Sequence, residues 1–313
     1  MGVQLGQLRC FLAVAEERHF THAARELGVA QPSVSARIHR LEEELGTPLF
    51  HRMKGNITLT PAGEALLPFA RRVLGEVGAA EREVRELAGL ARGRLSVGAT
   101  PSLTTTLLPP VLARFHGAYP GIDLALREAG SRDLVRSLEE GALDVALVIL
   151  PVSHDVLETV PLLREELVAA VSRTHGLAKR RSIAMSELRG VPLVMFRDGY
   201  DLRSTTINAC RQAGFEPTFA VEGGEMDGVL RLAEAGLGVA VVPSLVVGPK
   251  DALRAVRLVR PALTRTVGLA RRRDRQLSRA GQAFADGVRA LLGERHWLRR
   301  VPPGLVSLEP RKG

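Results

Sequence analysis

Residues 20–63 read FTHAARELGVAQPSVSARIHRLEEELGTPLFHRMKGNITLTPAG, and this stretch decides the fold of the N-terminal part of the chain. It predicts a short helix over Thr21–Leu27, which Gly28 ends because glycine tolerates the left-handed conformation at a helix C-terminus. Pro32 suits the first turn of a new helix, which runs to about Leu45. An earlier amphipathic helix carries apolar residues at helical spacing: Leu5, Leu8, Phe11, Leu12 and Ala15. Together these segments predict a helix-turn-helix.

The helix that begins near Pro32 has two contrasting faces. Val34, Ile38, Leu41 and Leu45 form one apolar stripe, which we expect to be buried. The other face offers side chains that can bond base edges and phosphates: Gln31, Ser33, Ser35, Arg37, His39 and Arg40. The carboxylates of Glu42–Glu44 come only toward the C-terminal end, and recognition helices present their N-terminal part to the major groove. The pattern predicts a DNA-recognition helix.

A basic hairpin follows the recognition helix. Gly55-Asn56 marks a turn between two short extended pieces, and Arg52 and Lys54 are predicted phosphate contacts on this wing. A generic helical domain without a ligand is the alternative for residues 1–60. The combination of a short helix, a tight turn, a polar-faced helix and a basic wing favours DNA binding.

This segment resembles the LysR-type transcriptional regulators. The matching residues are Ala23-Ala24, Leu27, Gln31–Ser35, Ile38, Leu41-Glu42, Leu45-Gly46, Pro48–Phe50, Arg52 and Leu59–Gly63. The resemblance implies that the segment binds promoter DNA as part of a dimer or tetramer. It also implies DNA contacts by Gln31, Pro32, Ser33, Ser35, Arg37 and Arg52, whereas His39 is matched less securely.

A long helix is predicted next, over residues 61–92, with Thr60 as its N-cap and Pro61 at its first position. Its apolar residues alternate spacings of four and three, which is a heptad seam: Leu66, Ala70, Val73, Val77, Ala80, Val84 and Leu87. The pattern favours a dimerisation helix that presents two recognition helices to a two-fold site. The alternative is one amphipathic helix packed on its own domain.

From Gly93 onward, predicted strands and helices alternate. The strands are 95–99, 122–127, 144–149, 167–172, 191–196, 219–222, 238–242 and 266–270, and the helices are 103–116, 131–140, 203–213, 226–235 and 280–292. Apolar strands between helices are typical of a parallel, doubly wound α/β sheet.

Within the resemblance, residues 93–292 form a two-lobed effector-binding domain like the periplasmic binding proteins, with lobe 1 at 93–160 and 265–292 and lobe 2 at 161–264. Ligands of open α/β sheets lie beyond the strand C-termini. That places these residues on the cleft: Thr100, Pro101, Ser102, Ser131, Arg197, Glu225 and Met226. Arg197 could bind a carboxylate, and Glu225 an amine, so the predicted effector is a carboxylate or an amino acid. The alternative for the hydroxyl residues is helix capping.

The bulk composition sets limits on the function. The 313 residues suggest two or three domains, and their net charge is +9. Residues 1–60 hold 7 basic and 6 acidic residues, whereas residues 264–300 hold 10 and 3, so the excess lies near the C-terminus. The run Arg271–Arg273 is either a solvated face or a surface for DNA or an acidic partner.

Other classes of protein find no support in the sequence. Cys10 and Cys210 are the two cysteines, too few and too far apart for a disulfide framework. The eight histidines lack metal-ligand spacing, and neither a nucleophile elbow nor a dinucleotide fingerprint is present, so we predict no enzyme, metal or cofactor. Gln4, Gln7 and Arg9 interrupt any apolar N-terminal segment, which argues against a signal peptide and predicts a cytoplasmic protein. No stretch approaches the ~20 apolar residues that a membrane helix needs.

We therefore expect a LysR-type DNA-binding transcription regulator, a homodimer or homotetramer whose promoter binding responds to a small-molecule effector. RNA polymerase would be a further partner of an activator. A transport-type solute-binding protein is the alternative, because such a protein would fit the C-terminal two-thirds of the chain. It is disfavoured because it does not account for residues 1–90 and because no export signal is recognised. Residues 293–313 are expected to be an extension that is partly mobile.

Overall fold

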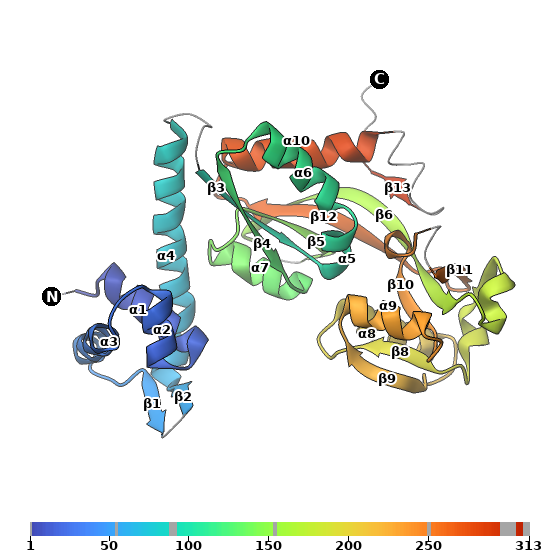
Figure 1. Cartoon of the computed structure of the whole chain (residues 1–313), viewed down its shortest axis with the longest axis horizontal. Coiled ribbons are helices and arrows are strands. Elements are labelled where there is room, and N and C mark those ends of the chain that lie inside the picture. The colour runs from blue at the N-terminus through green and yellow to red at the C-terminus, as the bar shows by residue number, and fades with distance from the viewer. Residues whose placement is uncertain are drawn as a thin grey trace. The chain divides into compact units, whose positions relative to one another are not determined.

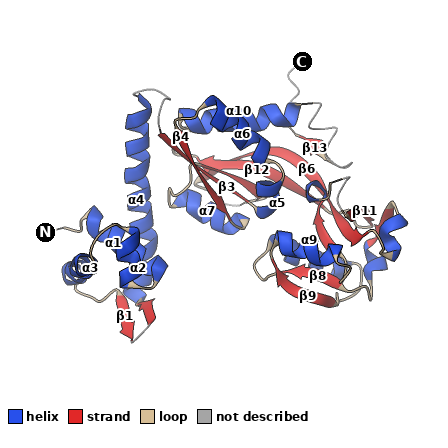
Figure 2. Cartoon of the chain, viewed as in Figure 1, coloured by secondary structure: helices blue, strands red, loops and turns tan. Residues whose placement is uncertain are grey.

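The computed structural model describes residues 2–53, 56–87, 93–152, 155–248, 252–294 and 305–308 (Figure 1). The chain divides into two compact units. One unit is Met1–Ala88 with Glu139–Ala142, and the other is Gly89–Leu138 with Leu143–Gly313. The N-terminal unit is mostly helical, and the C-terminal unit mixes helices with strands (Figure 2).

The N-terminal unit contains the predicted helices and the wing. Its elements are α1 (Leu5–Glu17), α2 (Phe20–Glu26), α3 (Gln31–Leu45), β1 (Phe50–Met53), β2 (Asn56–Leu59) and α4 (Pro61–Leu87). Gly28 and Gly46 end α2 and α3 with φ of 64° and 69°, the left-handed region that favours glycine. Phe11, Val34 and Ile38 are fully buried in the shared core. Leu45, predicted to be buried, is 40% exposed because it closes the last turn of α3.

Lobe 1 of the C-terminal unit is a sheet covered on both faces. It comprises β3 (Gly93–Ala99), α5 (Pro101–Thr105), α6 (Leu108–Ala118), β4 (Ile122–Glu128), α7 (Ser131–Glu139), β5 (Val145–Leu150), β12 (Thr264–Arg272) and α10 (Arg279–Gly293). Val145 and Leu147 of β5 belong to the core beneath α6 and α10. Their neighbours Ala146 and Val148 belong to the opposite core, beneath α7. This alternation is the period-two pattern of a strand buried on both sides.

Lobe 2 is built around its own core and is joined to lobe 1 by a long strand, β6 (Leu157–Ser172). Its other elements are η1 (Gly176–Lys179), β7 (Ser182–Ala184), η2 (Met185–Leu188), β8 (Leu193–Phe196), α8 (Asp201–Gln212), β9 (Phe219–Gly224), α9 (Met226–Glu234), β10 (Ala240–Pro243), η3 (Ser244–Val246) and β11 (Leu253–Val259). Leu162 and Leu163 pack in the lobe 1 core, whereas Leu167 packs in the lobe 2 core. The division between the lobes thus lies within β6, a few residues after the predicted position.

The sheet differs from the predicted all-parallel arrangement. β3 pairs in parallel with β4 and β5, but β12 is antiparallel to β5 and β6, and β6 is antiparallel to β10 and β11. The two strands that pass between the lobes, β6 and β12, are antiparallel to these neighbours. The order of apolar segments in the sequence predicts that strands are present but does not predict their direction. The sequence prediction also missed β11 and the first half of β6, where Glu158, Arg164 and Glu165 interrupt the apolar pattern.

The chain continues past α10 into a short strand, β13 (Val306–Ser307), which pairs with β6 at Arg164 and Leu163. The rest of the predicted C-terminal extension lies outside the described residues. Among the described residues, none of the helices combines the length and the apolar character needed to span a bilayer.

Candidate functional site

The predicted recognition face of α3 is open. Pro32, Ser33, Arg37, His39 and Arg40 are exposed, as is Gln31, whereas Ser35 is half-buried. Gln31 donates a hydrogen bond from Nε2 to Ser35 Oγ at 2.8 Å, which links two predicted DNA contacts across one helical turn. The DNA-contacting role of these side chains stays a prediction.

The acidic end of α3 has structural roles. Glu42 Oε1 accepts a hydrogen bond from the Leu49 backbone N–H at 2.8 Å, and Glu44 accepts one from Gln7 Nε2 at 3.2 Å. Glu43 lies 3.3 Å from His39 Nε2. These contacts hold the C-terminal half of α3 against its own unit. Most side chains of the N-terminal half are exposed.

Ala36 is a surface residue of α3 that the sequence reasoning missed. It is exposed, and it lies one helical turn from both Pro32 and Arg40, on the same face. A search for polar side chains misses Ala36 because alanine is apolar. A helical wheel would have placed it on the same face as Pro32 and Arg40. Its side chain is small, and alanine is one of the residues whose side chain suits contact with a thymine methyl group.

The wing and the dimerisation seam are described in part. Lys54, like the side chains of Arg52 and Leu87, lies outside the described residues. Ala70 is 1% exposed and packs in the core of its own unit together with Leu66. Ala70 is predicted from the heptad spacing to lie on the dimerisation seam, but its burial leaves it unavailable to a second subunit. Val73 and Val84 are 42% and 67% exposed. The remaining seam residues are Val77, half-buried, and Ala80, exposed.

A cavity of about 160 Å³ lies between the lobes of the C-terminal unit. Thr100, Pro101 and Ser102 line it from lobe 1, at the positions predicted from the strand end. The remaining lining residues are Gly130, Ile149, Leu150, Leu167, Tyr200, Asp201, Leu202, Thr205, Thr264 and Arg265. Both lobes and the connecting strands therefore contribute to one partly open cavity.

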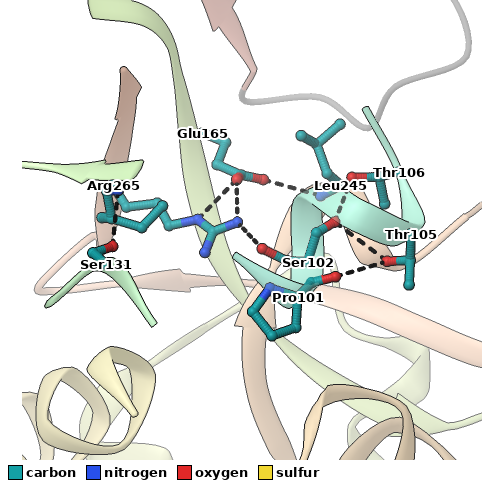
Figure 3. Close-up of polar contacts among 9 residues, drawn as sticks. Pro101, Ser102, Thr105, Thr106, Ser131, Glu165, Leu245 and Arg265 are labelled. Atoms are coloured by element: carbon teal, nitrogen blue, oxygen red, sulfur yellow. Dashed lines mark hydrogen bonds and ion pairs between the residues drawn. The ribbon is translucent and has the colours of Figure 1, made fainter. Parts of the chain in front are cut away.

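A buried ion pair lies at this cavity, with Arg265 among the lining residues and its partner Glu165 behind it (Figure 3). Arg265 on β12 donates from Nε to Glu165 Oε1 on β6 at 2.8 Å, and its Nη2 lies 2.7 Å from the same oxygen. Nη2 also donates to Ser102 Oγ at 2.7 Å. The Glu165 side chain is 0% exposed, and its second oxygen accepts the Leu245 backbone N–H at 3.2 Å. The network thus joins four elements, namely α5, β6, β12 and η3.

Three buried hydroxyl groups have no hydrogen-bond partner among the described residues: Ser244 Oγ, which is not on a cavity-lining residue, and two others. The two others are Thr100 Oγ1 and Tyr200 Oη, on side chains that are 6% and 8% exposed as residues. Both residues line the cavity. A buried hydroxyl without a partner is costly in a folded protein, so such groups mark a place where another molecule can bind.

Burial raises the pKa of the Tyr200 hydroxyl, and the nearby carboxylates of Glu225 and Glu128 raise it further. The group therefore stays protonated at neutral pH and can donate a hydrogen bond. The sequence reasoning missed Tyr200, Glu165 and Arg265. The sequence signal for the ion pair would have been a charged residue, Glu165 or Arg265, within each of two strands whose apolar residues predict burial.

Four predicted effector contacts lie elsewhere than expected. Arg197 and Glu225 are not among the cavity-lining residues, and they form an ion pair with each other on the surface, which raises the pKa of Arg197. Met226 is 3% exposed within the lobe 2 core, because the first turn of α9 packs inward. Ser131 Oγ accepts the Ile149 backbone N–H at 3.0 Å, so this hydroxyl has a structural role.

The run Arg271–Arg273 is engaged within its own unit. Arg271 donates to Glu158 at 2.6 Å and to the Arg275 carbonyl at 2.5 Å. Arg272 pairs with Asp274, and Arg273 donates to the Leu157 carbonyl at 3.3 Å. These contacts favour a structural role for the run over a surface for DNA.

Sequence comparison covers almost the whole chain. Residues 5–64 match the family described as "Bacterial regulatory helix-turn-helix protein, lysR family", and residues 88–293 match the "LysR substrate binding domain". The chain is 32% identical to the transcriptional dual regulator GltC of Bacillus subtilis (strain 168) over 289 residues, which cover 91% of this chain and 96% of GltC. It is 30% identical to the DNA-binding transcriptional dual regulator OxyR of Escherichia coli (strain K12) over 291 residues, covering 92% and 95%.

Solved structures agree with the sequence comparison. A full-length OxyR variant from Pseudomonas aeruginosa matches with a TM-score of 0.69 at 29% identity, covering 92% of this chain and 95% of that one. Full-length CbnR in complex with its target DNA matches with a TM-score of 0.67 at 28% identity, covering 92% and 99%. With a helix-turn-helix unit, a two-lobed effector-binding unit and these relatives, the chain belongs to the LysR family of DNA-binding transcription regulators.

Proposed function

We propose that the N-terminal half of α3 contacts promoter DNA, and that a small molecule in the cavity between the lobes regulates this binding. The pair of buried, unpartnered hydroxyls on the cavity wall is the observation that carries the ligand site. The wall draws on both lobes, with Thr100 and Ser102 from one and Tyr200 and Leu202 from the other. A ligand that contacts both lobes favours one arrangement of them, and it acts through its different affinities for the two states.

The predicted carboxylate or amino acid effector depended on Arg197 and Glu225, which pair with each other and are not among the cavity-lining residues, although the Arg197 guanidinium lies 5.8 Å from the centre of the Tyr200 ring. The size of the effector can be argued from the cavity itself. Its volume of about 160 Å³ is comparable to that of an engineered apolar cavity that binds benzene. The part of the effector that enters the cavity is therefore small, of about the size of one six-membered ring.

Replacing the unpartnered hydroxyls tests the ligand site. Tyr200→Phe and Thr100→Val are each expected to weaken effector binding about 3- to 10-fold, the contribution of one hydrogen bond, without lowering the melting temperature. Stability is spared because neither hydroxyl has a partner to lose among the described residues. A thermal-shift screen of metabolites would identify the effector, and calorimetry would then measure its affinity for each variant.

Thr206→Val is the matched control for these variants. Thr206 is a buried threonine outside the cavity lining, and its Oγ1 donates to the Leu202 carbonyl at 2.7 Å. This variant should lose about 1 kcal/mol of stability while the effector affinity stays unchanged. If Tyr200→Phe and Thr100→Val instead lose stability and retain full affinity, the ligand does not bind these hydroxyls.

We place the dimer contact on the open part of α4. Val73 and Val84 are large apolar side chains that are exposed within the N-terminal unit. Val73→Glu combined with Val84→Glu is expected to shift the protein toward a smaller species, because carboxylates would be buried against each other at a two-fold seam. Light scattering after size-exclusion chromatography measures the mass, and Ala65→Glu at an exposed position of the same helix is the control. An unchanged mass in the double variant would place the contact elsewhere.

Peroxide sensing is a function suggested by relatives whose names refer to hydrogen peroxide. The cysteine chemistry of this chain does not favour it. The thiolate is the form that peroxide oxidises, but Cys210 is fully buried and its burial raises the pKa to about 11. Cys10, the other cysteine of the sequence, is also buried and lies in the other unit.

Peroxide treatment is therefore expected to leave promoter affinity unchanged. The measurement is a gel shift with reduced and peroxide-treated protein, next to Cys210→Ser treated in the same way. Thiol titration with a chromogenic disulfide under native conditions should detect little reactive thiol. A peroxide-dependent shift that disappears in Cys210→Ser would reverse this conclusion.

A regulator of this kind works in the cytoplasm, where the promoter is, and RNA polymerase would be its partner if it activates transcription. We expect no catalytic activity. A gel shift with the DNA upstream of its own gene separates this function from solute transport, because a transport protein would give no specific shift. Increasing salt should weaken the complex, since phosphate contacts release counterions.

A further inference from the structure

We propose that the cavity between the lobes selects an uncharged, ring-sized ligand that accepts hydrogen bonds, and that Glu165 sets this selectivity by neutralising Arg265. The inference rests on the proposed function, because it names the chemical class of the molecule that binds there. It differs from the carboxylate expected from the sequence, and the reason lies in the charges of the cavity wall.

The wall carries little net positive charge for an anion. Its charged lining residues are Arg265 and Asp201. The guanidinium of Arg265 is already held by the Glu165 carboxylate, through Nε at 2.8 Å and Nη2 at 2.7 Å. The side chains of Arg265 and Glu165 are 8% and 0% exposed, so solvent screens neither of them well. Arg265 and Asp201 thus cancel within the lining, and the buried Glu165 behind Arg265 adds one negative charge.

A carboxylate that reached Arg265 would therefore also face Glu165. At a separation of about 6 Å and an effective dielectric constant of about 20, one unscreened like charge weakens binding roughly 100-fold. On the same scale the attraction of Arg265 at about 4 Å is larger than this repulsion, so the ion pair leaves a carboxylate only a small net attraction. The cost of removing the charge of the carboxylate from water opposes that attraction. An uncharged ligand avoids this repulsion altogether.

The same wall is well supplied with hydrogen-bond donors. Two of the three guanidinium nitrogens of Arg265 are joined by dashed lines in Figure 3, whereas Nη1 makes no hydrogen bond to the described residues. The Tyr200 and Thr100 hydroxyls are unpartnered in the described part of the chain. Because Tyr200 is held protonated, it can donate. A carbonyl oxygen would satisfy several of these donors without bringing in a charge.

The rest of the wall suits an apolar ring. Pro101, Ile149, Leu150, Leu167 and Leu202 supply most of it. The volume of about 160 Å³ accommodates one six-membered ring. Benzamide and benzoate are therefore an informative pair of probes, because they have almost the same shape and differ in charge.

The test measures the affinities of benzamide and benzoate for the full-length protein by calorimetry, with ligand-observed NMR for weak binding. Wild type should bind benzamide at least about 10-fold more tightly than benzoate. In Glu165→Gln, benzoate binding should tighten about 10- to 100-fold, while benzamide binding changes little. Glu166→Gln is the matched control, because Glu166 follows Glu165 on β6. Its carboxylate pairs with Arg257, which is not a residue of the cavity wall.

Tyr200→Phe locates the bound probe, because it should weaken benzamide binding if the ring lies in this cavity. Thermal unfolding shows whether Glu165→Gln is folded, and if it is not, the benzamide-to-benzoate ratio of wild type decides the question alone.

A wild type that binds benzoate as tightly as benzamide would overturn the selectivity and leave the ligand site intact. Equal benzoate affinity in wild type and folded Glu165→Gln would overturn the role of Glu165. Binding of neither probe would overturn the ligand class. Each result is separate from the promoter gel shift, which tests the proposed function independently.

Discussion

Ala36→Glu is expected to abolish specific promoter binding, with a loss of affinity of at least about 100-fold. Ala36 is exposed on α3, one turn from Pro32 and from Arg40. A glutamate there would bring a carboxylate close to base edges and phosphates, and it would prevent the close approach that a small side chain allows. Because each subunit of an oligomer carries the change, the losses at the half-sites add.

The affinity is measured by fluorescence anisotropy or gel shift with the upstream DNA. Ala65→Glu is the matched control, since it adds the same side chain at an exposed alanine of α4. Glutamate is a good helix former, so both variants should unfold at the wild-type temperature. If Ala36→Glu binds the promoter like Ala65→Glu, α3 does not enter the major groove with this face.

Arg265→Leu is expected to lower the free energy of unfolding of the C-terminal unit by about 3–5 kcal/mol. The substitution leaves the Glu165 carboxylate fully buried without its cation, with the Leu245 N–H as its remaining hydrogen-bond donor in the described part of the chain. Removing one partner of a buried pair is costly because the desolvated charge that stays behind is uncompensated. Urea unfolding followed by circular dichroism measures the loss.

The neighbouring ion pair provides the control. Arg257 holds Glu166, the next residue on β6, but the Arg257 side chain is 53% exposed. Arg257→Leu should therefore lose no more than about 1 kcal/mol. The double variant Glu165→Leu with Arg265→Leu should regain much of the stability of the single variant, because no buried charge remains. Equal losses in Arg265→Leu and Arg257→Leu would show that burial does not govern the cost.

The helix-turn-helix could be predicted well because its signals are local. Gly28, Pro32 and Gly46 mark helix ends whatever the rest of the chain does, and the two faces of α3 follow from spacing alone. The structure confirms these elements and the buried stripe of Val34 and Ile38. The alternation of strands and helices beyond Gly93 is local in the same sense, and most of those elements are confirmed.

The cleft could be predicted only in part, because it depends on which distant segments meet. The end of β3 indicated Thr100 and Ser102, since ligands bind beyond strand C-termini. Arg265 is far along the chain from Ser102, and no periodicity connects them before β6 and β12 pair. Arg197 and Arg265 are equally plausible anion ligands in the sequence. The tertiary structure distinguishes them, because Arg197 pairs with Glu225 and Arg265 pairs with Glu165.

The way the chain enters and leaves lobe 2 has a consequence for protein engineering. Glu166 of β6 and Thr264 of β12 are partners in the same ladder, so the intervening segment leaves and returns at one point of the lobe 1 sheet. Ends that are held this close need only a tight turn to join them, and shortening a loop reduces its closure entropy. Lobe 2 can thus be excised or exchanged with that of a related regulator at this point, provided that the replacement supplies the contact of Leu245, the residue of η3 that packs in the lobe 1 core.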